Sequence, residues 1–302
     1  LWDWADEKLF VHDEVSTDKR NPTLNPYGPV YGTTELSGDW LTVLDPIKHE
    51  ASRIAIPPPV EARPRRAGAI KVPSPYWGDE VIWDSQVVAH NPMMDSKGRV
   101  WMTARDACRV YDPATKELTH ISTCFSTHHL MFAEDAINTL WTSGGGQVVG
   151  WLDTKMFLET GDEARSQGWT ALIMDTNGNG KRDAYVEPDQ PVDPTMDKRF
   201  GRAFYGVSPA PDGSIWGSVT GFPGAVVRLD PGANPSETAL AEVYEPPLDS
   251  QGVPVEGFTP RGFDVDRDGV AWLAMSSGHL ASFDRRKCTG PLNGPTATGP
   301  HL

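Results

Sequence analysis

Five side chains capable of chemistry stand at the first position of a pattern that recurs along the chain. Four copies are twelve residues long: RNPTLNPYGPVY (20–31), HNPMMDSKGRVW (90–101), YGVSPAPDGSIW (205–216) and RGFDVDRDGVAW (261–272). A looser copy, HHLMFAEDAINTLW (128–141), is two residues longer. The first positions hold Arg20, His90, His128, Tyr205 and Arg261, and His129 follows His128. Such side chains can donate hydrogen bonds, hold an anion or bind a metal. The pattern therefore predicts a functional cavity wherever the fold brings its first positions together.

Two chemical roles are open for this set. In the first, His90 binds a divalent metal together with His128 or His129, and a carboxylate is the third ligand. In the second, Arg20 and Arg261 bind a substrate carboxylate while a neutral histidine acts as a general base. A structural interpretation competes with both, because arginine and histidine at strand starts can donate to backbone carbonyls that would otherwise be unpaired.

A second motif, DTNGNGKRDAYVEP (175–188), has the composition of a calcium-binding loop. Calcium takes six to eight oxygen ligands, and short Asp and Asn side chains at alternate positions wrap the ion while Gly180 permits the sharp turn. The predicted ligands are the oxygens of Asp175, Asn177, Asn179, Lys181 (backbone carbonyl), Asp183 and Glu187. The start resembles an EF-hand loop, but Glu187 stands one residue later than the EF-hand glutamate, which leaves its role open. Flanking apolar runs predict a turn between strands with structural Ca²⁺; the alternative is a metal-free turn.

The repeated pattern also predicts the elements that carry these side chains. In each copy an apolar run, a turn marked by Asp, Asn or Gly, and an aromatic residue that starts a second run indicate a β-hairpin. A third run follows and ends in Asp, often Asp-Pro, as in WLTVLDP (40–46) and AVVRLDP (225–231), and a fourth comes after it. Four antiparallel strands in about 40–45 residues are typical of a propeller blade. A β-sandwich is the alternative.

We expect an all-β fold, a single β-propeller domain spanning residues 1–302. Dividing the length by ~43 residues per blade gives about seven blades, with six as the second choice. The spacing of the copies leaves room for a degenerate blade between the first and second copies and another between 128–141 and 205–216. The stretch LWDWADEKLFVHDEV (1–15) is expected to complete the last blade, and the proline-rich residues 57–75 to cross between blades. A short helical insertion is expected at about 154–168.

Composition narrows the function classes. The formal charge of −14 argues against binding to nucleic acid or to an anionic lipid surface. No run of about 18 apolar residues is present, so no membrane span is expected. Cys108 and Cys124 flank a predicted hairpin and could pair, which would leave Cys288 over. A secreted or periplasmic protein is favoured, and because the chain begins at Leu1 we expect a processed or partial chain. The oligomeric state stays open.

The Asp-x-x-Gly-x-x-aromatic turn, followed by a strand that ends in Asp-Pro, resembles the β-propellers of the streptogramin B lyase (virginiamycin B lyase) type. It is also similar to the NHL-repeat and gluconolactonase-like groups. The resemblance implies that the first position of each copy lies near one mouth of a central channel. It further implies a histidine base and Mg²⁺, or another divalent metal, beside carboxylates. Glu256, five residues before Arg261, could supply one of these carboxylates.

The expected function is therefore that of an enzyme, a lyase or hydrolase of a lactone, ester or related anionic small molecule at the channel mouth. His90 or His128, with His129 beside it, would be the base, Arg20 and Arg261 the anion clamp, and Tyr205 a hydrogen-bond donor. One alternative is a non-catalytic propeller that binds a glycan, a peptide or a partner subunit. Another is a metal or redox centre built on the paired histidines.

Overall fold

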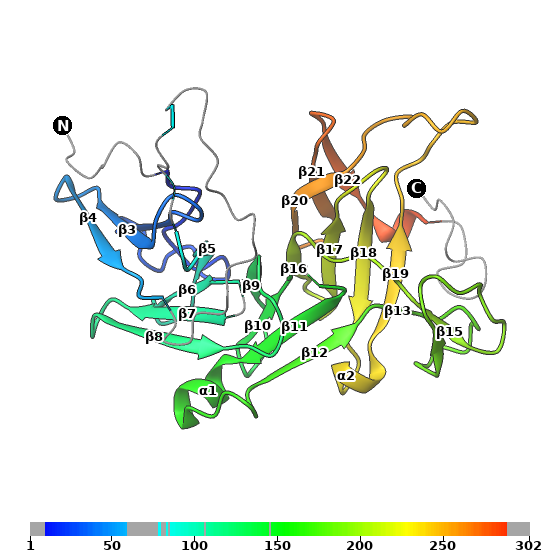
Figure 1. Ribbon diagram of the computed structural model, residues 1–302, viewed down its shortest axis with the longest axis horizontal. Coiled ribbons are helices and arrows are strands. Elements are labelled where there is room, and N and C mark those ends of the chain that lie inside the picture. The colour runs from blue at the N-terminus through cyan, green and yellow to red at the C-terminus, as the bar shows by residue number, and fades with distance from the viewer. Residues whose placement is uncertain are drawn as a thin grey trace. The chain divides into compact units, whose positions relative to one another are not determined.

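The computed structural model describes residues 10–58, 78–79, 83, 85–105, 107–144 and 146–288, and their regular secondary structure consists mainly of short β-strands (Figure 1). Within them the strands form six small sheets, four of four strands and two of three. The all-β prediction is confirmed, whereas the number of blades stays a prediction. Contacts divide the chain into two compact units, Leu1–Thr123 and Cys124–Leu302, and each unit is described by itself. The single propeller domain over 1–302 stays a prediction.

The first unit holds two four-stranded antiparallel sheets whose strands pair in chain order. One sheet comprises β1 (Asp13–Val15), β2 (Val30–Thr33), β3 (Trp40–Asp45) and β4 (Glu50–Ala55). The other comprises β5 (His90–Met94), β6 (Val100–Thr103), β7 (Ala107–Asp112) and β8 (Glu117–Ser122). These two sheets have the strand order expected of propeller blades.

The second unit holds four sheets; three pair their strands in chain order, and the small one has the order β13-β15-β14. The first comprises β9 (Leu130–Phe132), β10 (Thr139–Thr142), β11 (Val148–Asp153) and β12 (Gln167–Ala171). A small sheet follows, with β13 (Ile173–Met174), β14 (Tyr185–Val186) and β15 (Asp197–Arg199). The third comprises β16 (Val207–Pro209), β17 (Ile215–Val219), β18 (Ala225–Asp230) and β19 (Leu240–Tyr244). The last comprises β20 (Pro260–Val265), β21 (Ala271–Met275) and β22 (Leu280–Phe283). The small sheet lies in one of the two intervals where a degenerate blade was expected.

The start of the chain departs from expectation. Residues 13–15 form β1, which pairs with β2 in the first sheet, so this part of the stretch 1–15 does not complete the last blade. Residues 1–9 and residues 59–75 of the expected crossing lie outside the described part. The interval of the expected insertion contains the helix α1 (Thr154–Thr160). Its N-terminus is capped by Asp153, which accepts a hydrogen bond from the Met156 amide, and Gly161 ends it at φ 68°. Two shorter helical turns follow, α2 (Pro235–Thr238) and Arg285–Lys287.

The repeated turn has the same internal bonding in the second and last sheets. Asp95 accepts hydrogen bonds from the amides of Lys97 and Arg99 and from Nε1 of Trp101 at 2.9 Å. Asp266 accepts from the amides of Asp268 and Val270 and from Nε1 of Trp272 at 2.8 Å. The glycine at position nine has φ of 81° in the former and 77° in the latter, the left-handed region that glycine enters without cost. The spacing Asp-x-x-Gly-x-x-Trp is therefore what one closed turn requires.

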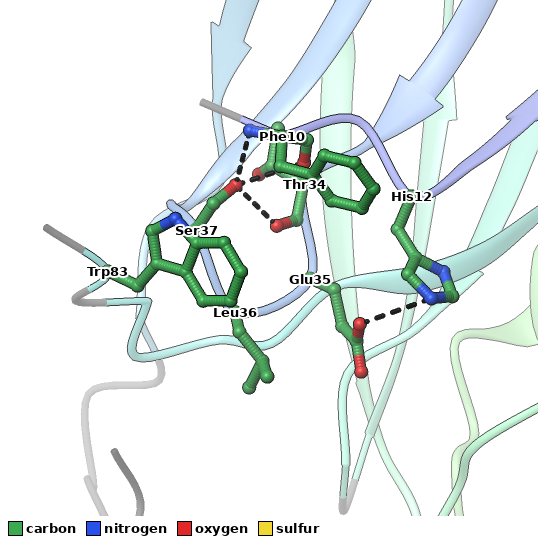
Figure 2. A pocket seen from close by; sticks show the side chains of 7 residues that line it. All are labelled: Phe10, His12, Thr34, Glu35, Leu36, Ser37 and Trp83. Carbon is green, nitrogen blue, oxygen red and sulfur yellow. Dashed lines mark hydrogen bonds and ion pairs between the residues drawn. The ribbon is translucent and has the colours of Figure 1, made fainter. Parts of the chain in front are cut away.

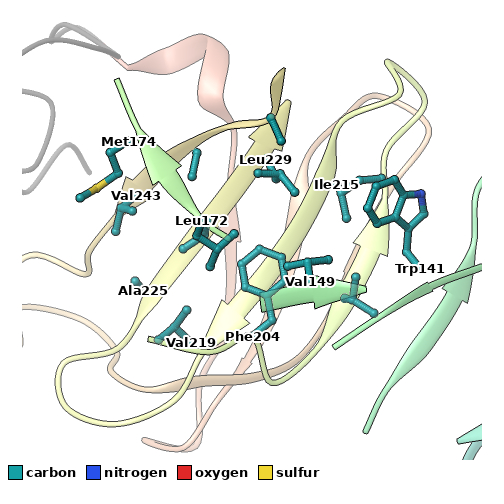
Figure 3. Close-up of a cluster of buried hydrophobic side chains, with 14 of the residues drawn as sticks. Trp141, Val149, Leu172, Met174, Phe204, Ile215, Val219, Ala225, Leu229 and Val243 are labelled. Atoms are coloured by element: carbon teal, nitrogen blue, oxygen red, sulfur yellow. The ribbon is translucent and has the colours of Figure 1, made fainter. Parts of the chain in front are cut away.

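Apolar side chains from several strands pack in each unit. In the first unit the buried cluster includes Leu41, Val100 and Met102, all fully buried. In the second unit a larger cluster joins residues of the sheets between β10 and β19, and Figure 3 shows Phe204 and Leu172 among them. Cross-strand burial of this kind supplies the main stabilisation of short-stranded sheets, which are marginal alone.

The three cysteines are free thiols. Cys108 is fully buried in β7, and burial raises the pKa of its thiol to about 12 despite the opposing charge of Arg109. Cys124 is exposed, and Cys288 is half-buried. The pairing of Cys108 with Cys124 is therefore not found. Among the described residues no helix is long and apolar enough to cross a membrane.

Candidate functional site

Backbone register identifies the residue that occupies the first position in each sheet. In three sheets the amide of that residue donates to the carbonyl of the residue two positions after the aromatic that ends the pattern. The bonds run from His12 to Thr33 at 2.9 Å, from His128 to Ser143 at 2.7 Å and from Tyr205 to Ser218 at 2.7 Å. In the second sheet His90 lies opposite Thr103, again two residues after the aromatic, Trp101. The first sheet therefore presents His12, not Arg20, at this position.

The position of Arg20 in the fold differs from the expected one. It lies in the connection between β1 and β2, where its Nε and Nη2 each lie 2.9 Å from an oxygen of the buried Asp18 carboxylate. The copy at 20–31 matches the pattern only because its second half enters β2; its first half forms turns rather than a strand. The Arg20 guanidinium thus already binds a carboxylate outside the first-position cluster, and its role as an anion clamp stays a prediction.

Local backbone features set the approach to two of these positions. The strand register shifts between His90 and Met93 in β5 and between Pro260 and Phe263 in β20, next to Arg261, and such irregularities re-aim neighbouring side chains. Val88 and Thr259, each two residues earlier, both have φ of 54°. β-Branched residues rarely adopt this conformation, and such strain of about 1–3 kcal/mol concentrates at functional sites.

In the first unit, His12 and His90 meet beside two carboxylates. The ring centroids of His12 and His90 are 4.8 Å apart. Oδ2 of Asp13 lies 3.1 Å from Nδ1 of His12 and 3.0 Å from Nε2 of His90, and Glu35 Oε2 lies 3.5 Å from Nε2 of His12. His12, Glu35 and His90 each offer one potential ligand atom, and these three atoms lie within 4.8 Å of one another. We call His12, Asp13, Glu35 and His90 the first-unit cluster.

Asp13 is the electrostatic centre of this cluster. Burial alone would raise the pKa of its carboxyl group, but attraction to His90, a hydrogen bond from His12 and the amide of Asn91 outweigh burial and lower that pKa. His90 is 3% exposed, whereas the His12 side chain is 37% exposed. Asp13 therefore stays ionised and orients both imidazoles, as carboxylates do behind histidine ligands of metals.

A pocket of about 230 Å³ lies against this cluster (Figure 2). His12 and Glu35 face each other at one side, and Phe10, Leu36 and Trp83 form apolar walls. The lining residues are Phe10, His12, Thr34, Glu35, Leu36, Ser37 and Trp83. The Phe10 and Trp83 rings stack at 6.4 Å. The pocket thus combines two potential metal ligands with aromatic surface.

In the second unit, the occupants of three first positions also come together. The ring of Tyr205 is 5.1 Å from that of His128 and 4.7 Å from that of His129. The guanidinium carbon of Arg261 lies 4.5 Å from the Tyr205 ring centroid, and Nη2 of Arg261 donates to the Tyr205 hydroxyl at 2.9 Å. We call His128, His129, Tyr205 and Arg261 the second-unit cluster. The clustering of first positions is thus observed within each unit; a single cavity that combines all of them stays a prediction.

Backbone carbonyls at two of these positions accept hydrogen bonds from serine hydroxyl groups that lie earlier in the chain. Ser143 donates to the carbonyl of Tyr205 at 2.5 Å, and Ser218 donates to the carbonyl of Arg261. The structural interpretation assigned this task to the first-position side chains. At these two carbonyls the donors are therefore serine hydroxyls.

Glu256 lies exposed on the segment between β19 and β20, five residues before Arg261. Its predicted role beside a metal stays a prediction; the carboxylates that lie beside first-position histidines in the first unit are those of Asp13 and Glu35. Sequence reasoning missed His12 and Glu35. A signal for His12 is present in FVHDEV, a short apolar-polar alternation. The residues at 20–31 match the repeated pattern better, so the first position was assigned to Arg20.

The predicted calcium loop lies between β13 and β14, as a turn between strands. Asp175 is buried and accepts from the amides of Gly178 at 2.7 Å and Gly180 at 2.8 Å. Oδ2 of Asp183 accepts from the side-chain amides of Asn177 at 3.1 Å and Asn179 at 2.5 Å. These bonds draw the oxygen-bearing side chains of the loop inward. The backbone amide of Lys181 donates to Oδ1 of Asn179 at 2.9 Å.

Two acidic residues after the loop differ in their surroundings. Glu187 is 53% exposed at its side chain and forms an ion pair with Arg199 at 3.3 Å. Asp197 is fully buried at the start of β15, and its Oδ2 accepts from the amide of Asp183 at 2.7 Å. Burial, followed by repulsion from Asp175 and Asp183, raises the pKa of Asp197 despite the Asp183 amide and Arg182.

No protein-family model and no curated protein matches the sequence, but solved structures match its fold. A catalytically inactive variant of virginiamycin B lyase from Staphylococcus aureus, with quinupristin, covers 95% of this chain and 72% of its own, at 11% identity and a TM-score of 0.52. Selenomethionine-substituted virginiamycin B lyase covers 88% and 68%, at 11% identity and 0.48. A gluconolactonase from Xanthomonas campestris covers 84% and 70%, at 12% identity and 0.39. The chain shares the fold of virginiamycin B lyase, which confirms the predicted resemblance at the level of fold.

Proposed function

We propose that this protein is a lyase or hydrolase acting on a lactone, ester or related anionic small molecule at the second-unit cluster. The observation that carries the proposal is the pairing of Arg261 with Tyr205 beside two imidazoles. A cation fixed on a phenol is a preformed site for a carboxylate or carbonyl oxygen, and a neighbouring imidazole can move a proton near pH 7. The fold shared with a lyase supports this class of reaction.

The chemistry follows from the positions of the groups. Arg261 and the Tyr205 hydroxyl would bind the substrate's carbonyl oxygen, and the guanidinium would stabilise the negative charge that develops there in the transition state. His128 or His129 would remove a proton either from water, which leads to hydrolysis, or from the carbon next to the carbonyl, which leads to elimination. The two reactions differ in their products, since only hydrolysis adds a water.

The test is turnover of quinupristin, simple lactones and carboxylate-bearing esters, followed by mass spectrometry. We expect Arg261→Gln to lower kcat/KM by roughly 100-fold or more, as loss of one donor to a developing oxyanion does. His128→Ala and His129→Ala should show which histidine is the base, because loss of a general base lowers the rate about 10²–10⁴-fold and loss of its neighbour should lower it less. Tyr205→Phe keeps the ring and should cost less than Arg261→Gln.

Arg267→Gln is the matched control, because Arg267 lies in the same sheet's turn and forms an exposed ion pair with Glu134. It should leave turnover unchanged. If the parent converts none of these substrates, or if Arg261→Gln and Arg267→Gln behave alike, the proposal is wrong. In that case ligand binding without turnover, unaffected by the histidine variants, would favour the non-catalytic alternative.

A second candidate function is a histidine-ligated metal centre, and the first-unit cluster favours it. Two imidazoles and one carboxylate within 4.8 Å form a donor set that suits Zn²⁺ or a similar transition ion better than Mg²⁺, which prefers oxygen ligands. Asp13 would hold the imidazoles from behind, and the pocket beside His12 and Glu35 would admit a ligand to an open coordination position.

Zn²⁺ titration of chelated protein in excess Ca²⁺ tests this centre. We expect one Zn²⁺ per chain, and a loss of affinity of about 10–100-fold or more in His12→Ala and Glu35→Gln. The side chains of His12 and Glu35 are both partly exposed, so these variants should fold. The control is His120→Ala, because His120 is an exposed histidine of the same unit. Equal affinities in all four proteins would show that any Zn²⁺ bound is not held by this cluster.

We further propose that the loop of residues 175–183 binds one structural Ca²⁺ and that the protein works outside the cytoplasm, secreted or periplasmic. Calcium sites of extracellular modules function with Kd values of about 10⁻⁴–10⁻³ M because calcium is abundant there. The inward-drawn Asp and Asn side chains of the loop support the calcium site.

A further inference from the structure

We infer that Asp197, the first residue of β15, is a ligand of the calcium ion proposed for the loop of residues 175–183. Its carboxylate takes the place that the sequence pattern assigned to Glu187. The inference rests on the proposed calcium loop and deepens it, because it names a ligand that lies outside the loop in sequence. It also specifies which strand the ion joins to the turn.

The surroundings of Asp197 call for a cation. Its side chain is fully buried, and while Oδ2 accepts from the Asp183 amide, Oδ1 has no hydrogen-bond partner among the described residues. A buried, unsatisfied carboxylate oxygen is costly unless a charge or a donor compensates it. The donor to Oδ2 is the amide of Asp183, itself a proposed ligand, so the buried carboxylate of Asp197 lies directly against the loop. Nη1 of Arg182, the neighbouring cation, donates to Thr170 Oγ1 at 2.7 Å.

Counting donors gives a set that fits calcium. The oxygens available are those of Asp175, Asn177, Asn179, Lys181 (backbone carbonyl), Asp183 and Asp197. Six oxygens reach the lower limit of calcium coordination, and three of them come from carboxylates that a divalent ion would neutralise in large part. Oδ1 of Asp175 accepts from the amides of Gly178 and Asn179, but Oδ2 accepts only from Gly180, so Oδ2 keeps a lone pair for the ion because each carboxylate oxygen offers about two. Glu187 has a different partner, Arg199.

The position of Asp197 gives the ion a structural task. β15 is the central strand of its sheet, paired antiparallel with β13 and parallel with β14. The loop leaves β13 and returns to β14, so an ion bound by both the loop and Asp197 ties the connection to the strand between them. Two-residue strands such as β13 and β14 contribute few ladder bonds. The bound ion would therefore add stability to a sheet that has few backbone hydrogen bonds between its strands.

Calcium titration of chelated protein, by calorimetry, tests the inference with three variants. Asp197→Asn keeps the shape and an acceptor for the Asp183 amide but removes the charge, and we expect its Kd for Ca²⁺ to rise roughly 100-fold. Asp175→Asn should lose binding to a similar extent. Glu187→Gln, the control, should bind like the parent within about twofold, since the Glu187 side chain pairs with Arg199.

Thermal unfolding supplies a second readout that a merely structural role would not give. Without Ca²⁺, Asp197→Asn should unfold at the same temperature as the parent or higher, because it removes a buried charge. With saturating Ca²⁺, the parent should gain stability and the variant should not. If Asp197→Asn binds Ca²⁺ like the parent while Asp175→Asn does not, the loop stands and the inference about Asp197 is overturned. If the parent binds no Ca²⁺, both are overturned.

Discussion

Replacing Asp95 with alanine is expected to lower the free energy of unfolding of the first unit by about 3–5 kcal/mol, the range for breaking a buried charge network. Asp95 is fully buried and accepts from the Lys97 and Arg99 amides, from Nε of Arg99 at 2.7 Å and from Nε1 of Trp101 at 2.9 Å. Hydrogen bonds to a charged group contribute about 1.5–3 kcal/mol each. Trp101 is itself fully buried, so its indole N–H would lose a partner that water cannot easily replace.

Denaturant unfolding followed by tryptophan fluorescence measures the effect, and the chain offers an internal control. Asp266 makes the same turn in the last sheet, but Trp272 is 45% exposed and can donate to water instead. Asp266→Ala should therefore cost clearly less than Asp95→Ala. The interpretation is wrong if the two variants lose equal stability, because burial of the indole would then not decide the cost.

These turns show how much of the fold the sequence could predict. Spacing alone indicated the hairpin at 90–101 and at 261–272, because one closed turn needs Asp, Gly and an aromatic at fixed positions. Spacing could not indicate where a different residue accepts the hydrogen bond from the indole N–H. At 205–216 the sixth residue is Ala210, and the indole of Trp216 donates instead to Ser214 at 2.9 Å. The same strand pairing is thus reached with a different acceptor.

The candidate sites were predicted in part, for a related reason. His128, Tyr205 and Arg261 were found because each stands beside a recognisable turn. His12 was missed because the connection between β1 and β2 separates it from the aromatic of its own hairpin, Tyr31. Asp197 was missed because nothing in its neighbourhood in the sequence marks a ligand. Both are long-range members of proposed sites whose local members form motifs, and only tertiary contacts reveal them.

Replacing Gly217 with alanine is expected to lower the free energy of unfolding of the second unit by about 3 kcal/mol, toward the upper end of the cost of overpacking a core. A Cβ at this position would lie 2.2 Å from Cδ2 and 2.3 Å from Cγ of Phe204. β17 cannot shift to relieve the clash, because Gly217 is paired with Val207 on one side and Val227 on the other. Phe204 is 2% exposed within the core cluster shown in Figure 3, so its ring must move against packed neighbours.

Gly262→Ala is the matched control. Gly262 also lies in a strand of the second unit, and a Cβ there would meet nothing within 4 Å. Its replacement should be neutral or stabilising, because alanine restricts the unfolded chain by about 0.4–1 kcal/mol. The double variant Gly217→Ala/Phe204→Leu separates the clash from strand propensity. If the clash is the cause, the smaller side chain makes room and the two substitutions together cost less than their sum. Strict additivity would instead place the cost in the backbone of β17, and the ring of Phe204 would then not be what requires glycine at this position.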